Sequence, residues 1–331
     1  MDFKLTEEHI MIRDAARDFA KTELLPGVIE RDEKQEFPKE LVKKMGDLGF
    51  LGMMASPEYG GGGMDTISYI LVMEELSKID ASASVMVSVN NSLVCWGLDT
   101  YGSEEQKKKY LSKLTTGEKL GAFCLSEPEA GSDATSQRTT AIDKGDHYVL
   151  NGTKNWITNG SSADYYLVIA QTDREKKHKG INAFIVEKGV EGFEIGPKEQ
   201  KMGIRGSDTH SLNFNDVKVP KENRIGEDGF GFKFAMKTLS GGRIGIAAQA
   251  LGIASGAYEL ALDYSKQRKA FGTEICNHQA IAFKLADMYT SIEASRHMVM
   301  RAAWDKDQGQ NYDLTGAMAK VYASKTAMDV T

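Results

Sequence analysis

Cysteine is scarce in this sequence, and the residues present do not form a pattern. Cys95, Cys124 and Cys276 lie far apart, with no CxxC spacing among them. This arrangement excludes a disulfide framework and a zinc ribbon. We therefore expect free thiols in a reducing cytosol.

Basic stripes, a secretion signal and long apolar runs are also missing. The net charge is −6 and the pI is about 5.7, and no stretch of Lys and Arg forms the positive stripe that nucleic-acid phosphates require. The N-terminus is acidic and lacks the apolar stretch of a secretory signal. No uninterrupted run of about 18 apolar residues occurs, which argues against a membrane span.

Several common active-site motifs are absent as well. Without GxGxxG the sequence has no Rossmann dinucleotide site, and without GxSxG it has no hydrolase nucleophile elbow. The six His residues are scattered, and neither HExxH nor another ligand spacing occurs. We therefore expect no metal site, and nicotinamide dehydrogenases and common hydrolases lose support.

The hydrophobic periodicity changes twice along the 331 residues, which are too many for one core. Residues 1–117 have apolar side chains at helical spacing and predict an N-terminal all-α domain. Residues 118–225 consist of short β-branched and aromatic segments between turn signals, which predict a middle antiparallel β-barrel or sandwich domain. Helical spacing returns in residues 226–331, predicting a C-terminal helical bundle that is incomplete. The expected fold class is α+β.

Local signals predict particular caps and one irregularity. Thr6 precedes two acidic residues and should cap the first helix, and Ser103 with Gln106 forms a capping box. In HSLNFNDVKVP the apolar alternation changes face near Asn215 and Asp216, which predicts a β-bulge there.

Two polar segments of the β part combine glycines and hydroxyl groups with one aromatic ring. CLSEPEAGSD, residues 124–133, places Ser126, Gly131 and Ser132 around a turn, and NGTKNWITNG, residues 151–160, contains Trp156 and Thr158. Taken singly, a plain turn and a core Trp are the ordinary interpretations. Taken together, the segments offer backbone amides, hydroxyls and one flat aromatic face.

The order of CLSEPEAGSD, NGTKNWITNG, MGIRGSDTHSLNF and RKAFG resembles the acyl-CoA dehydrogenase family over the whole chain. GGRIGIAAQALGIASGA and FKLADM are most similar to its short-chain, butyryl-CoA dehydrogenase branch. The resemblance implies FAD-dependent oxidation of a short-chain acyl-CoA to trans-2-enoyl-CoA, with electrons passed to electron-transfer flavoprotein. It also implies a cytoplasmic bacterial homo-oligomer, commonly a tetramer. A non-catalytic CoA-thioester-binding or scaffold homologue and an acyl-CoA oxidase remain alternatives.

A flavin needs an aromatic face, donors along its pyrimidine edge and a donor near N5. The resemblance assigns the face to Trp156 and the N5 donor to Thr158, which in an extended segment would point to the same side. Ser126 and the amides of Leu125 and Ser126 would bind the pyrimidine edge, where negative charge accumulates on reduction. Gly131 would let the backbone come close. The other FAD contacts that the resemblance implies are Phe123, Ile157, Ser132, Arg268, His278 and Gln279.

Substrate contacts are implied at Ser132, Ser240 and Arg243, the last near the CoA thioester. An acid commonly stands three residues before this Arg, and Ser240 replaces it here. In this branch the catalytic base is a Glu in a Tyr-Glu-Gly-Thr-like segment, and none occurs before Thr331; the alternative position in the family is Gly242. We therefore expect the base C-terminal to Thr331 in a longer natural protein. By itself the 331-residue chain should bind FAD weakly or not at all and should not dehydrogenate.

Overall fold

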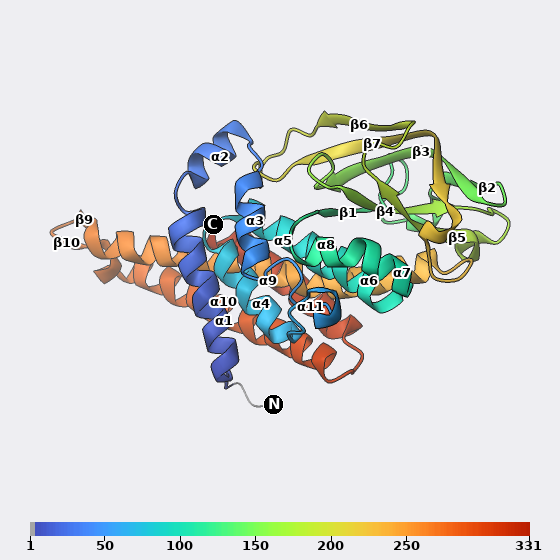
Figure 1. The fold of residues 1–331 in the computed structure, drawn as a ribbon. Helices are drawn as coiled ribbons and strands as arrows, with labels where there is room; N and C mark the ends of the chain where they lie inside the picture. Colours follow the sequence, from blue (N-terminus) through green and yellow to red (C-terminus); the bar gives the residue numbers. More distant parts are fainter. Residues whose placement is uncertain (1–3) are drawn as a thin grey trace. The chain divides into compact units, whose positions relative to one another are not determined.

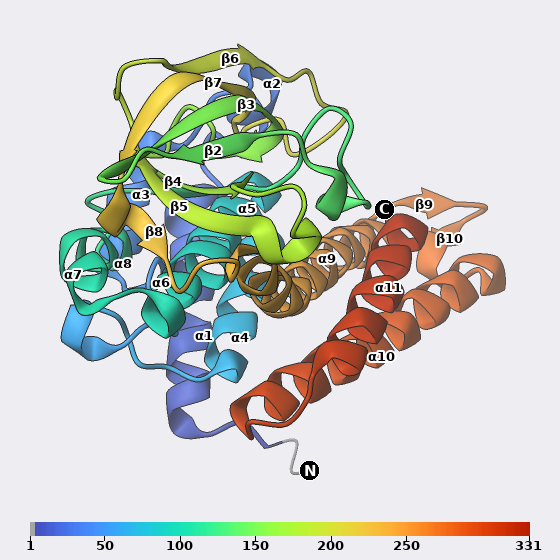
Figure 2. The same cartoon turned by 90° about the vertical axis from the view of Figure 1, so that its right-hand side faces the viewer.

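The computed structural model describes residues 4–331 and forms two compact units. The first unit comprises Met1–Val28, Asp65–Val85 and Arg243–Thr331, and the second comprises Ile29–Met64 and Met86–Gly242. Figures 1 and 2 show that the first unit is helical apart from one short hairpin and that the second combines helices with a sheet.

The first unit contains helices from both ends of the chain. Thr6 caps the first helix, as predicted, by accepting a hydrogen bond from the His9 amide at 3.2 Å. The helices of this unit, two of which extend beyond it, are α1 (Glu7–Phe19), α4 (Thr66–Ser77), α5 (Ala81–Ser88), α9 (Gly231–Gln267), α10 (Gln279–Asp307) and α11 (Asp313–Val330). A short hairpin of β9 (Lys269–Ala270) and β10 (Thr273–Glu274) follows α9.

Helix α4 is buried on nearly all sides although it carries two acidic residues. Arg296 of α10 pairs with Glu74 at 2.6 Å, and Arg17 of α1 pairs with Glu75 at 2.9 Å. Buried charges are tolerated when they are paired and hydrogen-bonded. These ion pairs therefore let α4 occupy the interior of the first unit.

The helices of the second unit precede and follow its sheet. Ser103 and Gln106 form the predicted capping box. Short π-helical turns interrupt the run from α5 to α8. The further helical elements are α2 (Val28–Lys34), α3 (Lys39–Asp47), η3 (Val89–Cys95), α6 (Trp96–Tyr101), α7 (Glu104–Gln106), η4 (Lys107–Leu111) and α8 (Ser112–Thr115).

One sheet dominates the second unit, with the strand order β6-β7-β3-β2-β4-β5-β8 and β1 paired to β4. The predicted antiparallel pairing is confirmed except between β1 and β4 and between β2 and β4, which are parallel. The strands are β1 (Gly121–Cys124), β2 (Thr140–Asp143), β3 (His147–Thr158), β4 (Tyr165–Gln171), β5 (Ile181–Glu187), β6 (Phe193–Lys198), β7 (Thr209–Pro220) and β8 (Arg224–Ile225).

Strand β4 is buried throughout because it contributes to two apolar clusters. Leu167 and Ile169 pack with helical residues such as Leu98 and Phe234. Tyr166, on the other face, packs with residues of β3, β5 and β7. Alternate side chains of a strand point to opposite faces, so β4 joins the helices to the interior of the strand layer.

Two bulges interrupt the long ladder between β3 and β7. On β7 one extra residue lies between Val217 and Phe214, and Asp216 has a positive φ of 53°. This is the bulge predicted near Asn215 and Asp216. A second bulge, which the sequence analysis did not predict, lies on β3 between Lys154 and Ile157.

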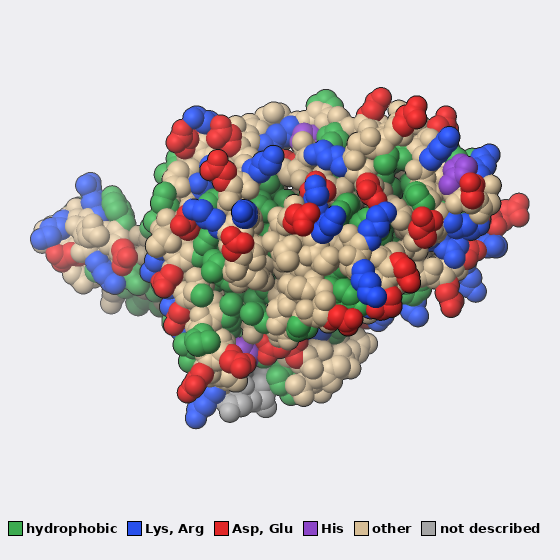
Figure 3. All heavy atoms as spheres, viewed as in Figure 1, with side chains coloured by type: hydrophobic (Ala, Val, Ile, Leu, Met, Phe, Trp, Pro, Cys, Tyr) green, Lys and Arg blue, Asp and Glu red, His purple; other side chains and the backbone are tan. Residues whose placement is uncertain are grey.

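The surface charge and the apolar helices relate to two expectations from the sequence, the absence of a basic stripe and the absence of a membrane span. On the face shown in Figure 3, acidic and basic side chains are interspersed. Of the helices within residues 4–331, α9 alone is long and apolar enough to cross a membrane, and 61% of its apolar window is buried inside the protein. The core helix of a soluble protein meets the same criterion, so this finding is weak evidence for a span.

Candidate functional site

Trp156 is exposed near the end of β3, although Lys154 and Ile157 of the same strand are buried. Its side chain is 60% exposed, whereas Lys154 and Ile157 are 0% and 2% exposed. The backbone at Trp156 is left-handed, with φ 55°, which is unusual for a bulky residue. It lies in the β3 bulge. A large aromatic ring held exposed in a strained conformation indicates a binding surface.

Thr158 is the last residue of β3 and pairs with Thr209 of β7. The prediction that Thr158 shares a side with Trp156 assumed an extended backbone, and the left-handed conformation of Trp156 removes that assumption. Both side chains still lie outside the core, because the intervening Ile157 is the buried one. The Thr158 hydroxyl has no hydrogen-bond partner within residues 4–331.

The segment after β1 is tied directly to the β3 bulge. The amide of Asn155 donates to the carbonyl oxygen of Ser126 at 2.9 Å. The structure therefore brings Ser126 close to Trp156, as the resemblance implies. Phe123 and Leu125 pack in the apolar cluster beneath this segment. Neither the amide N–H nor the hydroxyl of Ser126 is paired in the described part of the chain.

A buried lysine underlies the same segment, and the sequence analysis missed it. The Lys154 ammonium donates to the carbonyl oxygen of Leu125 at 3.0 Å, to Glu127 Oε1 at 2.7 Å and to Gln137 Oε1 at 3.1 Å. Three acceptors require three N–H donors, which the charged form supplies. A lone Lys between Thr and Asn carries no periodicity that would signal its burial.

Glu127 completes this buried network from the other side. Its carboxylate accepts hydrogen bonds from the amides of Arg138 at 2.5 Å and Thr139 at 3.1 Å. Burial alone would raise the pKa of Glu127, but the Lys154 charge and these hydrogen bonds lower it below its ordinary value. Glu127 is therefore a paired structural carboxylate, and we assign it no role as a base.

The chain beyond the β3 bulge is fixed by a second buried carboxylate. Asp208 Oδ2 accepts from the amides of Ser161 and Ser162, both at 2.8 Å. Asn159, fully buried with φ 62°, donates from its amide to the Asp208 carbonyl at 3.0 Å and from Nδ2 to the Gly121 carbonyl at 3.0 Å. Hydrogen bonds thus hold the backbone on both sides of the bulge.

The predicted phosphate-contacting loop is exposed. A Cβ added at Gly131 would meet no atom of the described residues within 4 Å, so none of them requires glycine there. Ser132 is exposed. Glu129, for which the sequence analysis found no role, forms an ion pair with Arg138 at 2.5 Å on the surface.

Three further predicted FAD contacts gather in the first unit, around the β9–β10 hairpin. Arg268 immediately precedes β9, and His278 and Gln279 stand at the start of α10. The ring of His278 makes a hydrogen bond through Nε2 to the Ala270 carbonyl at 3.1 Å, which fixes it to the hairpin. Phe271 at the hairpin tip is 98% exposed with φ 53°. Phe271 is not among the contacts predicted from the sequence.

Two of the three predicted substrate contacts, Ser240 and Arg243, lie on α9, and the third, Ser132, lies in the exposed loop described above. Ser240 is buried and Arg243 is half-buried, and both make contacts within the chain. At Gly242, an added Cβ would lie 2.9 Å from Leu93 Cδ2, so this position is filled by packing. These positions, like the FAD contacts above, remain predictions.

Thiol and metal chemistry receive no support from the described residues. Cys95 and Cys124 are buried, and burial raises the pKa of both thiols; Cys276 is partly exposed. The predicted free thiols are confirmed. Within residues 4–331, no group of three or more His, Cys, Asp or Glu could hold a metal ion.

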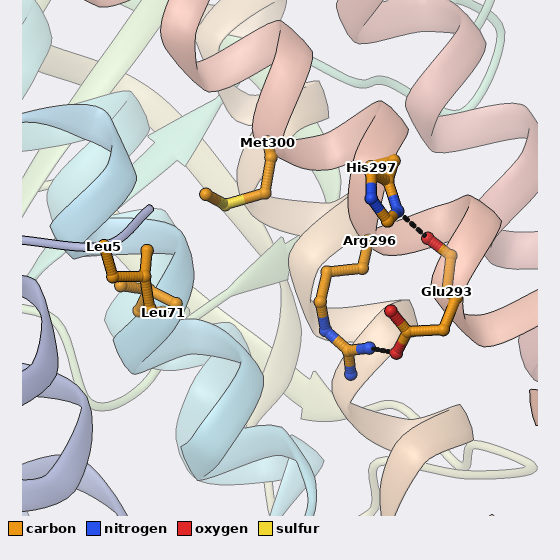
Figure 4. Close-up of a pocket in the computed structure, with 6 residues that line it drawn as sticks. All are labelled: Leu5, Leu71, Glu293, Arg296, His297 and Met300. Atoms are coloured by element: carbon orange, nitrogen blue, oxygen red, sulfur yellow. Dashed lines mark hydrogen bonds and ion pairs between the residues drawn. The ribbon is translucent and has the colours of Figure 1, made fainter. Parts of the chain in front are cut away.

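A cavity of about 220 Å³ lies in the first unit (Figure 4). Arg296 pairs with Glu293 and Glu74, and His297 Nδ1 makes a hydrogen bond of 2.7 Å to the Glu293 carbonyl. The charged groups around this cavity are thus engaged with one another, and we assign it no ligand. The lining residues are Leu5, Leu71, Glu293, Arg296, His297 and Met300.

Three family models match consecutive parts of the chain. The N-terminal domain of acyl-CoA dehydrogenase matches residues 6–118, the middle domain matches residues 122–217 and the C-terminal domain matches residues 229–331. The short-chain specific acyl-CoA dehydrogenase of Clostridium acetobutylicum is 51% identical over 331 residues, which are 100% of this chain and 87% of that protein. The chain belongs to the acyl-CoA dehydrogenase family.

Solved structures agree with this assignment. Butyryl-CoA dehydrogenase from Megasphaera elsdenii has a TM-score of 0.98 at 49% identity, and a structure described as the electron transferring flavoprotein of Acidaminococcus fermentans has 0.98 at 52%; each match covers 100% of this chain and 87% of the other. A glutaryl-CoA dehydrogenase from Mycobacterium smegmatis in complex with FADH2 has 0.93 at 33%, covering 98% and 83%. The predicted acyl-CoA dehydrogenase fold and enzyme class are confirmed.

Proposed function

We propose that this acyl-CoA dehydrogenase oxidises a short-chain acyl-CoA such as butyryl-CoA to the trans-2-enoyl-CoA, uses FAD and passes the electrons to an electron-transferring flavoprotein. The observation that carries the proposal is Trp156, an exposed indole in a strained bulge, beside the unpaired donors of Ser126 and Thr158. The similarity to short-chain enzymes and to a butyryl-CoA dehydrogenase supports the substrate class.

The donors present fit the edges of an isoalloxazine. Its pyrimidine edge offers carbonyl oxygens and a ring nitrogen as acceptors, and the Ser126 amide and hydroxyl are donors that no described residue accepts from. The exposed indole offers a surface on which a flat ring can stack. The open space at Gly131 leaves room for a ligand to approach the backbone.

Within the second unit, Trp156 would support the flavin ring, Ser126 and Leu125 would bind its pyrimidine edge, and Thr158 would donate to N5. Arg268, with its permanent charge, would bind the pyrophosphate of FAD held by a second copy of the chain. This assignment makes the active protein a homo-oligomer, and we propose a tetramer from the family resemblance. The remaining proposed FAD contacts are Phe123, Ile157, Gly131, Ser132, His278 and Gln279.

The reaction removes a proton from the α-carbon and a hydride from the β-carbon, and a double bond forms between them. FAD, when bound, supplies the acceptor for the hydride. Arg243, and Ser132 or Ser240, would bind and orient the CoA thioester, which brings the acyl chain into a reactive geometry. The buried carboxylates of the second unit that lie near the bulge are engaged in pairing, and we assign no catalytic base within residues 4–331.

Titration of the purified chain with FAD tests the proposal. Tryptophan fluorescence and flavin absorbance are followed without oxygen, and acyl-CoA thioesters from butyryl to dodecanoyl are then added. Of the two outcomes that the sequence allows, weak binding of FAD or none, the exposed Trp156 and the donors of Ser126 favour weak binding, and we expect a larger spectral change with butyryl-CoA than with dodecanoyl-CoA. Absence of FAD binding at any concentration would therefore refute the cofactor assignment.

The same experiment separates the alternatives. Acyl-CoA binding without any FAD binding would favour a CoA-thioester-binding homologue. Rapid dioxygen consumption, with no transfer to electron-transferring flavoprotein, would favour an oxidase. Sustained turnover with a dye acceptor would support dehydrogenation and place a base within the 331 residues.

A further inference from the structure

We infer that Lys154 is a positioning residue that acts through the Leu125–Ser126 peptide to strengthen the donor facing the flavin pyrimidine edge. The inference rests on the proposed function, because it takes Ser126 as the residue that binds this edge. It adds to that function a buried residue that does not touch the cofactor and yet favours its reduced form.

Lys154 is placed to act on this one peptide group. Its side chain is fully buried, and its ammonium donates to the Leu125 carbonyl oxygen at 3.0 Å. That carbonyl and the Ser126 N–H belong to the same peptide unit. Withdrawal of electron density at the oxygen makes the N–H a stronger donor, since linked hydrogen bonds polarise one another.

The peptide is also fixed in position. The Asn155 amide donates to the Ser126 carbonyl at 2.9 Å, and Lys154 holds the preceding carbonyl from the same strand. The Ser126 N–H is thereby held in one orientation while no acceptor among residues 4–331 binds it. Donors held in place before charge develops stabilise that charge more effectively than mobile ones.

Stability alone does not account for a charge at this position. A buried ion pair can often be replaced by apolar residues of similar volume without loss of stability. The fully buried ion pair between Lys154 and Glu127, 2.7 Å apart, could therefore be replaced as a pair. What an apolar residue cannot supply is the hydrogen bond to the Leu125 carbonyl.

Lys154 should raise the affinity for reduced FAD relative to oxidised FAD. Reduction adds negative charge at the pyrimidine edge, so a stronger Ser126 donor favours reduced over oxidised FAD. Lys154→Met removes the polarising ammonium and should weaken binding of reduced FAD more than binding of oxidised FAD. Glu127→Gln keeps the Lys154 side chain in place but removes the carboxylate that opposes the lowering of the Lys154 pKa by burial. At a pH low enough to keep Lys154 charged, this variant should keep the preference for the reduced form at or above that of the unmodified chain.

The experiment measures the affinity of the full chain for oxidised and for dithionite-reduced FAD under anaerobic conditions. We expect the reduced-to-oxidised preference to fall about tenfold in Lys154→Met, which for a two-electron couple corresponds to about 30 mV. Lys221→Met is the matched control, since Lys221 pairs with Asp143 at 2.9 Å on the surface of the same unit. This control should leave the preference unchanged.

A variant that removes both charges controls for misfolding of the Lys154→Met single variant, in which Glu127 would be buried without its cation. Lys154→Met combined with Glu127→Gln leaves no unpaired buried charge, and thermal unfolding of the flavin-free chain verifies its fold. This double variant should show the same lowered preference for reduced FAD. Equal weakening of both redox forms in the folded variants would overturn the inference and leave the FAD assignment intact. Failure of the unmodified chain to bind either form would overturn both.

Discussion

The two bulges of the β3–β7 ladder have the same backbone conformation and different causes. At Asp216, φ is 53°, the carboxylate accepts a hydrogen bond of 2.9 Å from Asn151 Nδ2, and the Asp216 backbone amide donates one of 2.9 Å to Asn151 Oδ1. Asp tolerates the left-handed region, and local polar chemistry suffices there. At Trp156, φ is 55° in a bulky residue whose indole makes no hydrogen bond to any of residues 4–331. The surroundings impose this second bulge, which is typical of a functional site.

The largest effect is expected at Lys154, whose buried ion pair fixes the chain before the Trp156 bulge. Lys154→Ala leaves Glu127 buried without its cation and should lower the free energy of unfolding by about 3–5 kcal/mol. Denaturant titration measures this loss. Lys221→Ala, on the exposed ion pair with Asp143, should change stability by less than about 1 kcal/mol. Equal losses in the two variants would contradict the special role of the buried pair.

A smaller loss is expected at Asp208, which fixes the chain after the same bulge. Asp208→Asn keeps the shape but removes the charge that receives the Ser161 and Ser162 amides, so it should cost about 1.5–3 kcal/mol. FAD affinity should fall with it, because the bulge loses one of its supports. Unchanged stability and affinity would show that the bulge does not depend on this carboxylate.

The third test replaces the bulge residue Trp156 itself with glycine. Trp156→Gly removes the stacking surface and should reduce FAD affinity by about 1–3 kcal/mol, measured by flavin titration. The flavin-free chain should become more stable, by roughly 1 kcal/mol, since glycine adopts a positive φ without strain. Loss of stability comparable to the loss of affinity would identify the indole as a structural residue.

Asp216→Gly is the counterpart and should have the smallest effect. Glycine again accepts the positive φ, and the one exposed hydrogen bond that is lost, from Asn151 Nδ2 to the carboxylate, contributes little, so the free energy of unfolding should change by less than about 1 kcal/mol. FAD affinity should not change. Any clear loss of FAD binding in this variant would contradict the distinction between the two bulges.

The sequence predicted the bulge at Asp216 and not the one at Trp156, for a physical reason. In HSLNFNDVKVP the apolar alternation changes face at the inserted residue, so the pattern contains the irregularity. In NGTKNWITNG no alternation precedes the bulge, and its position depends on contacts with Ser126 and Asp208, which lie far away in the chain.

The fold and the residue types of the site were predictable to different extents. Periodicity and turn residues indicated the helical, sheet and helical order, whereas FAD and its contacts came from the family resemblance. The buried pair of Lys154 and Glu127 was missed because two charged residues 27 positions apart carry no sequence signal of proximity. Short strands such as β8 (Arg224–Ile225) were also missed, since two residues cannot show alternation.

The three thiols differ in their exposure, so labelling them with maleimide can distinguish folded from unfolded chains. A maleimide added to native protein should react once, at Cys276 beside the β9–β10 hairpin, because Cys95 and Cys124 are shielded. A chain that unfolds would also expose Cys95 and Cys124, so mass spectrometry would measure the unfolded fraction from chains that carry two or three adducts. The single adduct would also place a fluorophore next to the residues proposed to reach the FAD of a neighbouring copy.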